Sequence, residues 1–312
     1  MNDVMPERDA VRLFTVPITP ELAQEVAAAL AHFRDLAGEA FQLQNPDTFD
    51  QNTTSVFRRE YEQMGTLAEP LREERRKLYS MLIHVADLTK DNAFDHVRAL
   101  EHDILMDPPP VWSPLTLSRV AMEGVLISEY LLDPTISLAK RLARVAGVWM
   151  TDASHQEKQA LALGADQPDA AGMKAYVEDC LTKCQVMERR NARDKLIGYS
   201  VDGEDAPMDL NITERAAQAM PSWLPAPYRM VSGAAHNRPW ILDRARNLAG
   251  GAGLAGEAAT VMAAAAVAMG AIETAVRTFG EFFGVNMSAV LDQMETDQKA
   301  FLDRAIDIAH PQ

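Results

Sequence analysis

The chain has 312 residues, 47% of them hydrophobic, so it is long enough to bury one large core or two smaller ones and we expect it to fold. Its formal net charge of −15 excludes non-specific adhesion to nucleic acid, because neutralising phosphates requires clustered lysine and arginine. Aromatic residues make up only 6%, and alternating β-branched runs are missing, so the composition predicts an all-α fold.

Three features of the sequence bear on where the protein works. Residues 1–7 lack a basic stretch followed by an apolar one, so we expect no secretory signal. The longest uncharged apolar run, 258–272, is shorter than the ~20 residues of a membrane span and predicts a buried helix. Cys180 and Cys184 lie four apart on a predicted helix, where disulfide geometry is poor. We therefore expect a protein of the reducing cytoplasm with no membrane partner.

Helices are predicted throughout the first hundred residues. Thr19 and Pro20 predict the start of a helix that runs to about residue 43, and two more are predicted over about 48–64 and about 67–106. Apolar residues of the long helix form one heptad seam, which indicates a helical partner, either the first helix or a second subunit: Leu67, Leu71, Leu78, Met81, Val85 and Leu88.

The proline run Pro108-Pro109-Pro110 cannot continue a helix. We therefore predict a lobe boundary there, with an N-terminal helical hairpin or coiled-coil lobe over 1–107 and a helical bundle over 111–312. The bundle is predicted to contain a long connection over 198–227, and such connections are often functional or mobile. Its helices are predicted at about 113–132, 135–163, 169–197, 228–248 with a kink at Pro239, 254–283 and 287–309.

Two predicted helices of the second lobe carry polar side chains on apolar faces. Arg119 and Glu123 lie four residues apart, and Arg229, Ser232 and His236 share a face at spacings of three, four and seven. Ionisable groups are costly to bury unless they are paired, so we expect the two helices to meet, with Arg119 paired to Glu123 around a common pocket.

The residue types of this predicted pocket favour one kind of chemistry. A histidine can exchange a proton with a ribose hydroxyl or a leaving oxygen near neutral pH, and an arginine can hold a phosphate. The set therefore fits RNA cleavage with no metal and no cofactor. A buried polar network that serves packing alone is the other interpretation of the same residues.

The segment from Arg229 to His236 resembles the Arg-x4–6-His signature of HEPN domains, helical bundles found in toxin and antiviral ribonucleases and in related nucleotide-binding proteins. With Ser118-Arg119, Glu123 and Tyr-Leu-Leu at 130–132, followed by Tyr228, Ser232 and His236, the chain resembles, over about 112–290, the HEPN-like proteins of unknown function common in actinobacteria. The resemblance implies a homodimeric ribonuclease that binds RNA through a local basic site, with His236 as general acid or base, Arg229 or Arg119 on the phosphate, and an antitoxin-like partner protein. Met230 stands where active members often have a polar residue, so a non-catalytic helical interaction or scaffold module is the alternative.

Other patterns have simpler interpretations. Glycines at 251, 253 and 256 match a dinucleotide-binding fingerprint but lack the preceding strand, which favours a helix end. Arg304 and His310 also match the Arg-x4–6-His signature at the tail, without the apolar context of the first pair. Basic residues at 189–193 and 238–246 favour ion-paired surface, although the second group could extend a phosphate track from His236.

Overall fold

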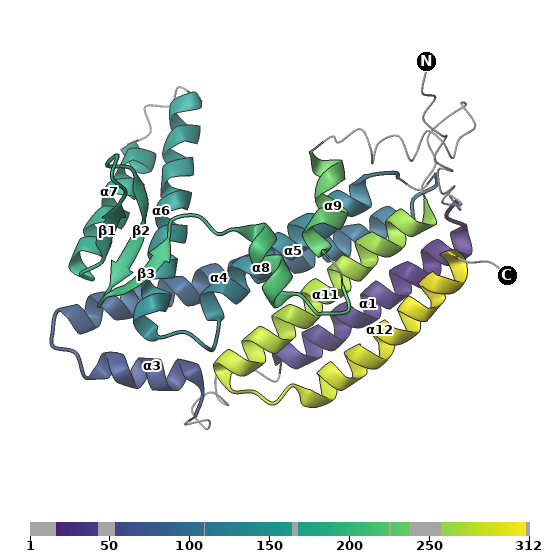
Figure 1. Cartoon of the computed structure of the whole chain (residues 1–312), viewed down its shortest axis with the longest axis horizontal. Helices are drawn as coiled ribbons and strands as arrows, with labels where there is room; N and C mark the ends of the chain where they lie inside the picture. Colours follow the sequence, from purple (N-terminus) through teal and green to yellow (C-terminus); the bar gives the residue numbers. More distant parts are fainter. Residues whose placement is uncertain are drawn as a thin grey trace, which may run out of the picture.

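The computed structural model describes residues 17–42, 54–108, 110–163, 168–224, 226–236 and 257–309. Within these ranges the chain forms ten helices and one three-stranded sheet, so the predicted helical bundle is confirmed, with a small sheet added. Most helices run along one elongated bundle, and α6, α7 and the sheet project from one side of it as an arm (Figure 1). The helices are α1 (Pro20–Gln42), α3 (Val56–Gly65), α4 (Leu71–Ile104), α5 (Ser113–Leu132), α6 (Leu138–Ala162), α7 (Pro168–Lys183), α8 (Ile212–Ala219), α9 (Pro227–Ala235), α11 (Ala258–Phe283) and α12 (Ser288–Ala309).

Helix α11 lies at the centre of the bundle and packs against α1, α5 and α12. Nearly all of its side chains are buried, and its many alanines let neighbouring helices approach closely. Among the described residues it is the one helix long and apolar enough to cross a membrane, but 89% of its most apolar window is buried inside the protein. The prediction of a buried helix at 258–272 is confirmed.

Helices α4 and α5 pack with their backbones close together. A Cβ added at Gly124 of α5 would lie 2.7 Å from the carbonyl oxygen of Thr89 on α4. The hydroxyl of Thr89 lies 2.8 Å from that of Ser128, which also donates to the Ala86 carbonyl. Of the predicted heptad seam, Leu78 is buried and Met81 and Val85 pack against the core. Leu88 is 53% exposed, so the predicted register is wrong at that position.

Two hydrophobic clusters form the core. One joins α1, α9, α11 and α12 to the second half of α4 and the first half of α5. The other joins α3, α6, α7 and the sheet to the first half of α4 and the ends of α5 and α11. Each cluster therefore takes side chains from both sides of the predicted boundary at 107–110.

The sequence interpretation is wrong for residues 184–219. The helix predicted over 169–197 ends at Lys183, and three antiparallel strands follow in the order β1-β2-β3: β1 (Met187–Arg190), β2 (Leu196–Val201) and β3 (Glu204–Pro207). Asp202 and Gly203 form the tight turn between β2 and β3 with positive φ angles of 49° and 86°. An Asp-Gly pair is a strong hairpin signal, so the sequence itself indicates this turn. Helix α8 also lies within the predicted connection.

Several predicted features lie outside the described residues: the kink at Pro239, the basic residues at 238–246, the glycines at 251–256 and His310.

Candidate functional site

The candidate site forms where α9 lies against the first half of α5, as Figure 1 shows. Helix α5 begins with Ser113 and Pro114 and turns an apolar face to α4 and α11, which leaves Arg119 and Glu123 on a partly exposed side. The Arg119 Nε donates to Glu123 Oε1 at 2.7 Å. Their side chains are 15% and 31% exposed, so water reaches both groups. The predicted pairing of these two residues is confirmed.

Tyr228 of α9 and His236, which directly follows α9, contact the other two nitrogens of the Arg119 guanidinium. Nη2 donates to the hydroxyl of Tyr228 at 3.1 Å, and the guanidinium carbon lies 5.2 Å from the centre of the tyrosine ring. Nη1 lies 3.2 Å from Nε2 of His236, which follows the last turn of α9. The two predicted segments therefore meet through residues 117 positions apart in the chain.

The hydrogen bond with Arg119 requires one particular tautomer of the His236 imidazole. A guanidinium can only donate hydrogen bonds, so Nε2 must accept and the imidazole must be neutral, with its proton on Nδ1. His236 is exposed, and its backbone N–H donates to the Ser232 carbonyl at 3.1 Å. The one lone pair that could take a proton is thus occupied by Arg119 in this state.

The other two predicted site residues, Arg229 and Ser232, make fewer contacts. Arg229 is exposed at the start of α9, and no side-chain hydrogen bond or ion pair joins it to the other described residues. Ser232 is half-buried, and its hydroxyl makes no hydrogen bond within the described ranges. Arg119, Glu123 and His236 therefore come together, while Arg229 and Ser232 only border them. Tyr228 also contacts Arg119, and this contact was not predicted.

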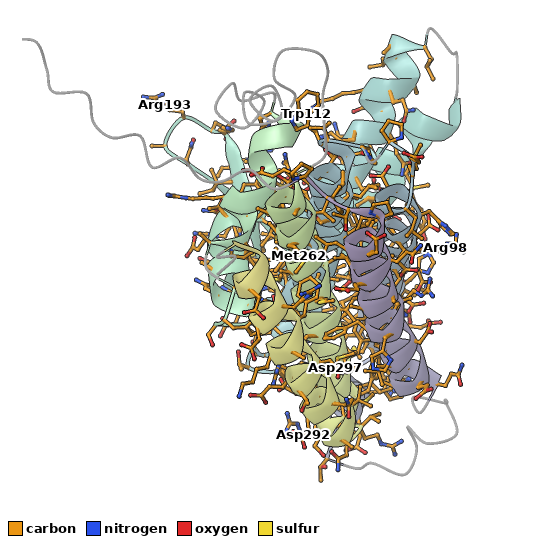
Figure 2. The ribbon with its side chains drawn as sticks, turned by 90° about the vertical axis from the view of Figure 1, so that its right-hand side faces the viewer. Arg98, Trp112, Arg193, Met262, Asp292 and Asp297 are labelled. Atoms are coloured by element: carbon orange, nitrogen blue, oxygen red, sulfur yellow. The ribbon has the colours of Figure 1, made fainter. Side chains whose placement is uncertain are left out.

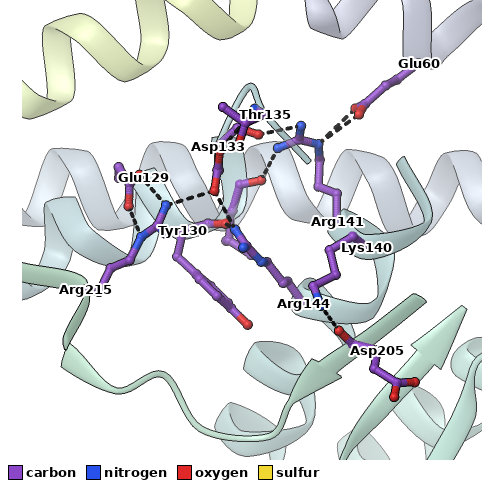
Figure 3. A network of polar contacts seen from close by, with 11 residues as sticks. Glu60, Glu129, Tyr130, Asp133, Thr135, Lys140, Arg141, Arg144, Asp205 and Arg215 are labelled. Carbon is purple, nitrogen blue, oxygen red and sulfur yellow. Dashed lines mark hydrogen bonds and ion pairs between the residues drawn. The ribbon is translucent and has the colours of Figure 1, made fainter. Parts of the chain in front are cut away.

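A second polar network, which the sequence interpretation missed, is buried beside the arm (Figure 3). Arg141 is fully buried, and its guanidinium donates to Glu60 at 3.0 Å and to the carbonyls of Leu131 and Asp133. Arg144 and Arg215 both contact the Asp133 carboxylate, and Arg215 also binds Glu129. The three arginines tie α3, α6 and α8 to the end of α5.

Burial sets the protonation behaviour of this network. Burial raises the pKa of Glu129 even though Arg215 opposes it, and burial likewise raises the pKa of Glu60 against Arg141. Burial alone would also raise the pKa of Asp133, but hydrogen bonds from Thr135 and Arg215 outweigh it and hold that pKa at about 2. Every carboxylate here has an arginine partner and little access to solvent, so the network fits a structural role better than a catalytic one.

The two cysteines and the acidic and histidine side chains of the described ranges form no metal site. Cys180 is half-buried and Cys184 is buried, and both are free thiols. No group of three or more histidine, cysteine, aspartate or glutamate side chains that could hold a metal ion occurs in the described ranges.

Comparison of the chain with protein-family models, with curated proteins and with solved structures finds no match.

Proposed function

We propose that the chain is a ribonuclease of the HEPN type that cleaves RNA without a metal, with His236 transferring the proton and Arg119 holding the phosphate. The observation that supports the proposal is the 3.2 Å contact between Arg119 Nη1 and His236 Nε2 on a partly exposed surface. A proton-transfer group and a phosphate-binding group lie side by side there, which is the minimum that this chemistry needs.

The same contact defines how the reaction would begin. A phosphate is a stronger acceptor for an arginine than a neutral imidazole, because both partners are charged, so bound RNA would draw Arg119 away from His236. The freed Nε2 would take the proton of the ribose 2′-hydroxyl, and the 2′-oxygen would attack the adjacent phosphorus. The bond from phosphorus to the 5′-oxygen would break, and that oxygen would take a proton from water, which leaves a 2′,3′-cyclic phosphate and a 5′-hydroxyl.

Neighbouring residues would orient the arginine and extend its charge. Glu123 and Tyr228 each hold one nitrogen of Arg119, so the guanidinium keeps its place as the histidine is released. Arg229 is an exposed cation on the same helix as Tyr228 and could bind a neighbouring phosphate. In this proposal the protein acts in the cytoplasm as a homodimer that places a second copy of the site nearby, and an antitoxin-like protein covers it.

Purified protein incubated with RNA beside matched variants tests the proposal. We expect His236→Ala and Arg119→Ala each to lower the cleavage rate about 100-fold or more, as loss of proton transfer or charge stabilisation generally does. Mass spectrometry of the products should find 2′,3′-cyclic phosphate ends. Two exposed residues outside the site, His84 and Arg98, provide control variants His84→Ala and Arg98→Ala that should keep full activity. Cleavage that persists unchanged in both site variants eliminates the assignment.

A non-catalytic interaction module is the second candidate, and the surface of the arm favours it. Large apolar side chains there face solvent: Leu161 and Leu163 are each 74% exposed at the end of α6, Tyr176 is 56% exposed on α7, and Met187 is 59% exposed on β1. Exposed apolar side chains in number often mark a protein contact. Light scattering of the native chain and of Leu161→Ser/Leu163→Ser decides: a monomer in both cases, with no partner recovered by a pull-down, removes this candidate.

A further inference from the structure

A cavity of about 570 Å3 lies between the segment 219–223, α11 and the first half of α12. Its volume is within the range of small-molecule sites. None of the Arg119–His236 site residues lines it, so it is a separate feature of the protein. Figure 2 shows Asp292, one of its lining residues, near the end of α12 that follows α11.

A buried carboxylate, Glu273, is held in a fixed orientation in the wall of this cavity. The residue is 7% exposed, and its oxygens accept hydrogen bonds from three directions. Gln298 Nε2 donates at 2.7 Å, Arg277 Nη2 at 2.5 Å and Trp223 Nε1 at 3.4 Å. These donors come from α12, from α11 and from the segment before α9, so the wall is organised before any ligand arrives.

The amide of Gln298 leaves a free acceptor beside the carboxylate. Gln298 is 3% exposed and lines the cavity. Because a carboxylate only accepts hydrogen bonds, the amide must turn Nε2 to Glu273, and its Oε1 is then the free end. Within the described ranges no hydrogen bond reaches that oxygen. An amide oxygen is an acceptor, so it is suited to an N–H donor from a ligand.

The charge of the lining points to the class of ligand. Three carboxylates and one guanidinium line the cavity, so the lining is net negative. Asp292 and Glu295 are exposed, and no ion pair joins either side chain to another described residue. The half-buried indole of Trp223 adds an aromatic surface of the kind that binds organic cations.

We propose that this cavity binds an organic cation that carries N–H donors, a guanidinium or alkylammonium group. The cation would lie between the carboxylates of Asp292 and Glu295 and donate to Gln298 Oε1. The group could belong to a free small molecule or to an arginine or lysine side chain of a peptide, since both present the same head group.

Isothermal titration calorimetry of the full chain with simple probes tests the proposal. The probes are n-butylguanidinium chloride, its uncharged analogue n-butylurea, and the peptide acetyl-Gly-Arg-Gly-amide. We expect saturable binding of the cations and at least tenfold weaker binding of n-butylurea, roughly the loss of one charge-assisted hydrogen bond. Tighter binding of the peptide than of n-butylguanidinium assigns the site to a peptide side chain, and the reverse order assigns it to a free small molecule.

Variants on one helix provide the matched control. Asp292→Asn/Glu295→Gln should weaken cation binding about tenfold or more. Asp303→Asn/Asp307→Asn makes the same charge change on exposed residues of α12 that do not line the cavity, and it should leave the affinity within about twofold. If the first double variant does not fold, Glu295→Gln alone replaces it, because Glu295 is exposed. The proposal is overturned by the absence of saturation up to about 10 mM cation, by equal binding of n-butylurea, or by an equal loss in both variants.

Discussion

Arg141 on α6 and Glu60 on α3 form an ion pair that is almost sealed from water. The Arg141 side chain is fully buried, and that of Glu60 is 7% exposed. The hydroxyl of Tyr79 donates to the same carboxylate at 2.8 Å, and the Phe282 ring lies 4.8 Å from the guanidinium carbon. Residues from α3, α4, α6 and α11 thus depend on one another for hydrogen bonds and packing.

Removing one partner of this pair should destabilise the protein strongly. Arg141→Met leaves the Glu60 carboxylate buried without its cation, so we expect a loss of about 3–5 kcal/mol in the free energy of unfolding. Replacing both partners removes the stranded charge, and Glu60→Leu/Arg141→Met should therefore recover most of that loss. Urea unfolding followed by circular dichroism measures both variants. A double variant no more stable than Arg141→Met would contradict the account.

Asp133 should make the protein sensitive to acid. Its pKa in the folded protein is about 2, which is below the value near 3.9 expected in an unfolded chain. Between these values the unfolded state binds more protons, so the stabilisation is complete above about pH 4 and is lost as the pH falls toward 2. Unfolding measured across this range should be less pH-dependent in Asp133→Asn than in the native chain. Identical slopes would show that the ionised carboxylate is not the cause.

Glu129 should affect the pH dependence of stability in the opposite direction to Asp133. Burial raises its pKa in the folded protein, so the folded state holds its proton more tightly than the unfolded state does. Its contribution to stability is therefore present below the unfolded pKa and declines as the pH rises through the folded one. We expect Glu129→Gln to flatten the decline of stability above about pH 4, which thermal unfolding at a series of pH values would measure. A decline of unchanged slope in this variant would contradict the assignment.

Local spacing predicted the candidate site better than it predicted the network around Asp133. Arg119 and Glu123 are four apart on an apolar helix, and that spacing alone indicates their pairing. The meeting with His236 follows from the cost of leaving polar groups on apolar faces. In contrast, Glu60 lies 81 positions from Arg141, and no local pattern relates them. The available signal was two arginines, Arg141 and Arg144, in an otherwise apolar stretch of α6.

Local sequence patterns also predict the helices, but they do not predict the sheet. Pro114 and Pro134 lie near the two ends of α5 in the sequence, and the helix spans Ser113–Leu132 as predicted, although Ser113 is its first residue and not a side-chain cap. Strands β1 and β3 are four residues long and rich in charge, and β2 is an uncharged run of six residues, so none of them shows the regular apolar alternation that would distinguish it from helix. Their stability comes from packing β2 on α6, a tertiary contact that no local window contains.

Gly124 should tolerate no side chain. A Cβ at this position would lie 2.7 Å from the Thr89 carbonyl oxygen, a backbone atom that cannot move alone. We expect Gly124→Ala to force α4 and α5 apart and to lower the free energy of unfolding by about 1–3 kcal/mol. Gly38 of α1 is the control, because an added Cβ there meets nothing within 4 Å. Gly38→Ala should raise stability by about 0.5–1 kcal/mol through better helix propensity. Equal effects of the two changes in urea unfolding would contradict the close packing of α4 on α5.

The two cysteines should differ in reactivity although they lie one helical turn apart. Burial raises the pKa of the Cys184 thiol to about 12, so almost no thiolate exists there at neutral pH. Cys180 is half-buried and in contact with solvent, which gives a reagent access that Cys184 lacks. Iodoacetamide at neutral pH should therefore label Cys180 in the folded protein and reach Cys184 only after unfolding in urea, as peptide mass spectrometry would measure. Cys180→Ser should then show almost no labelling when folded. Rapid labelling of that variant would mean that the end of α7 opens readily and exposes Cys184.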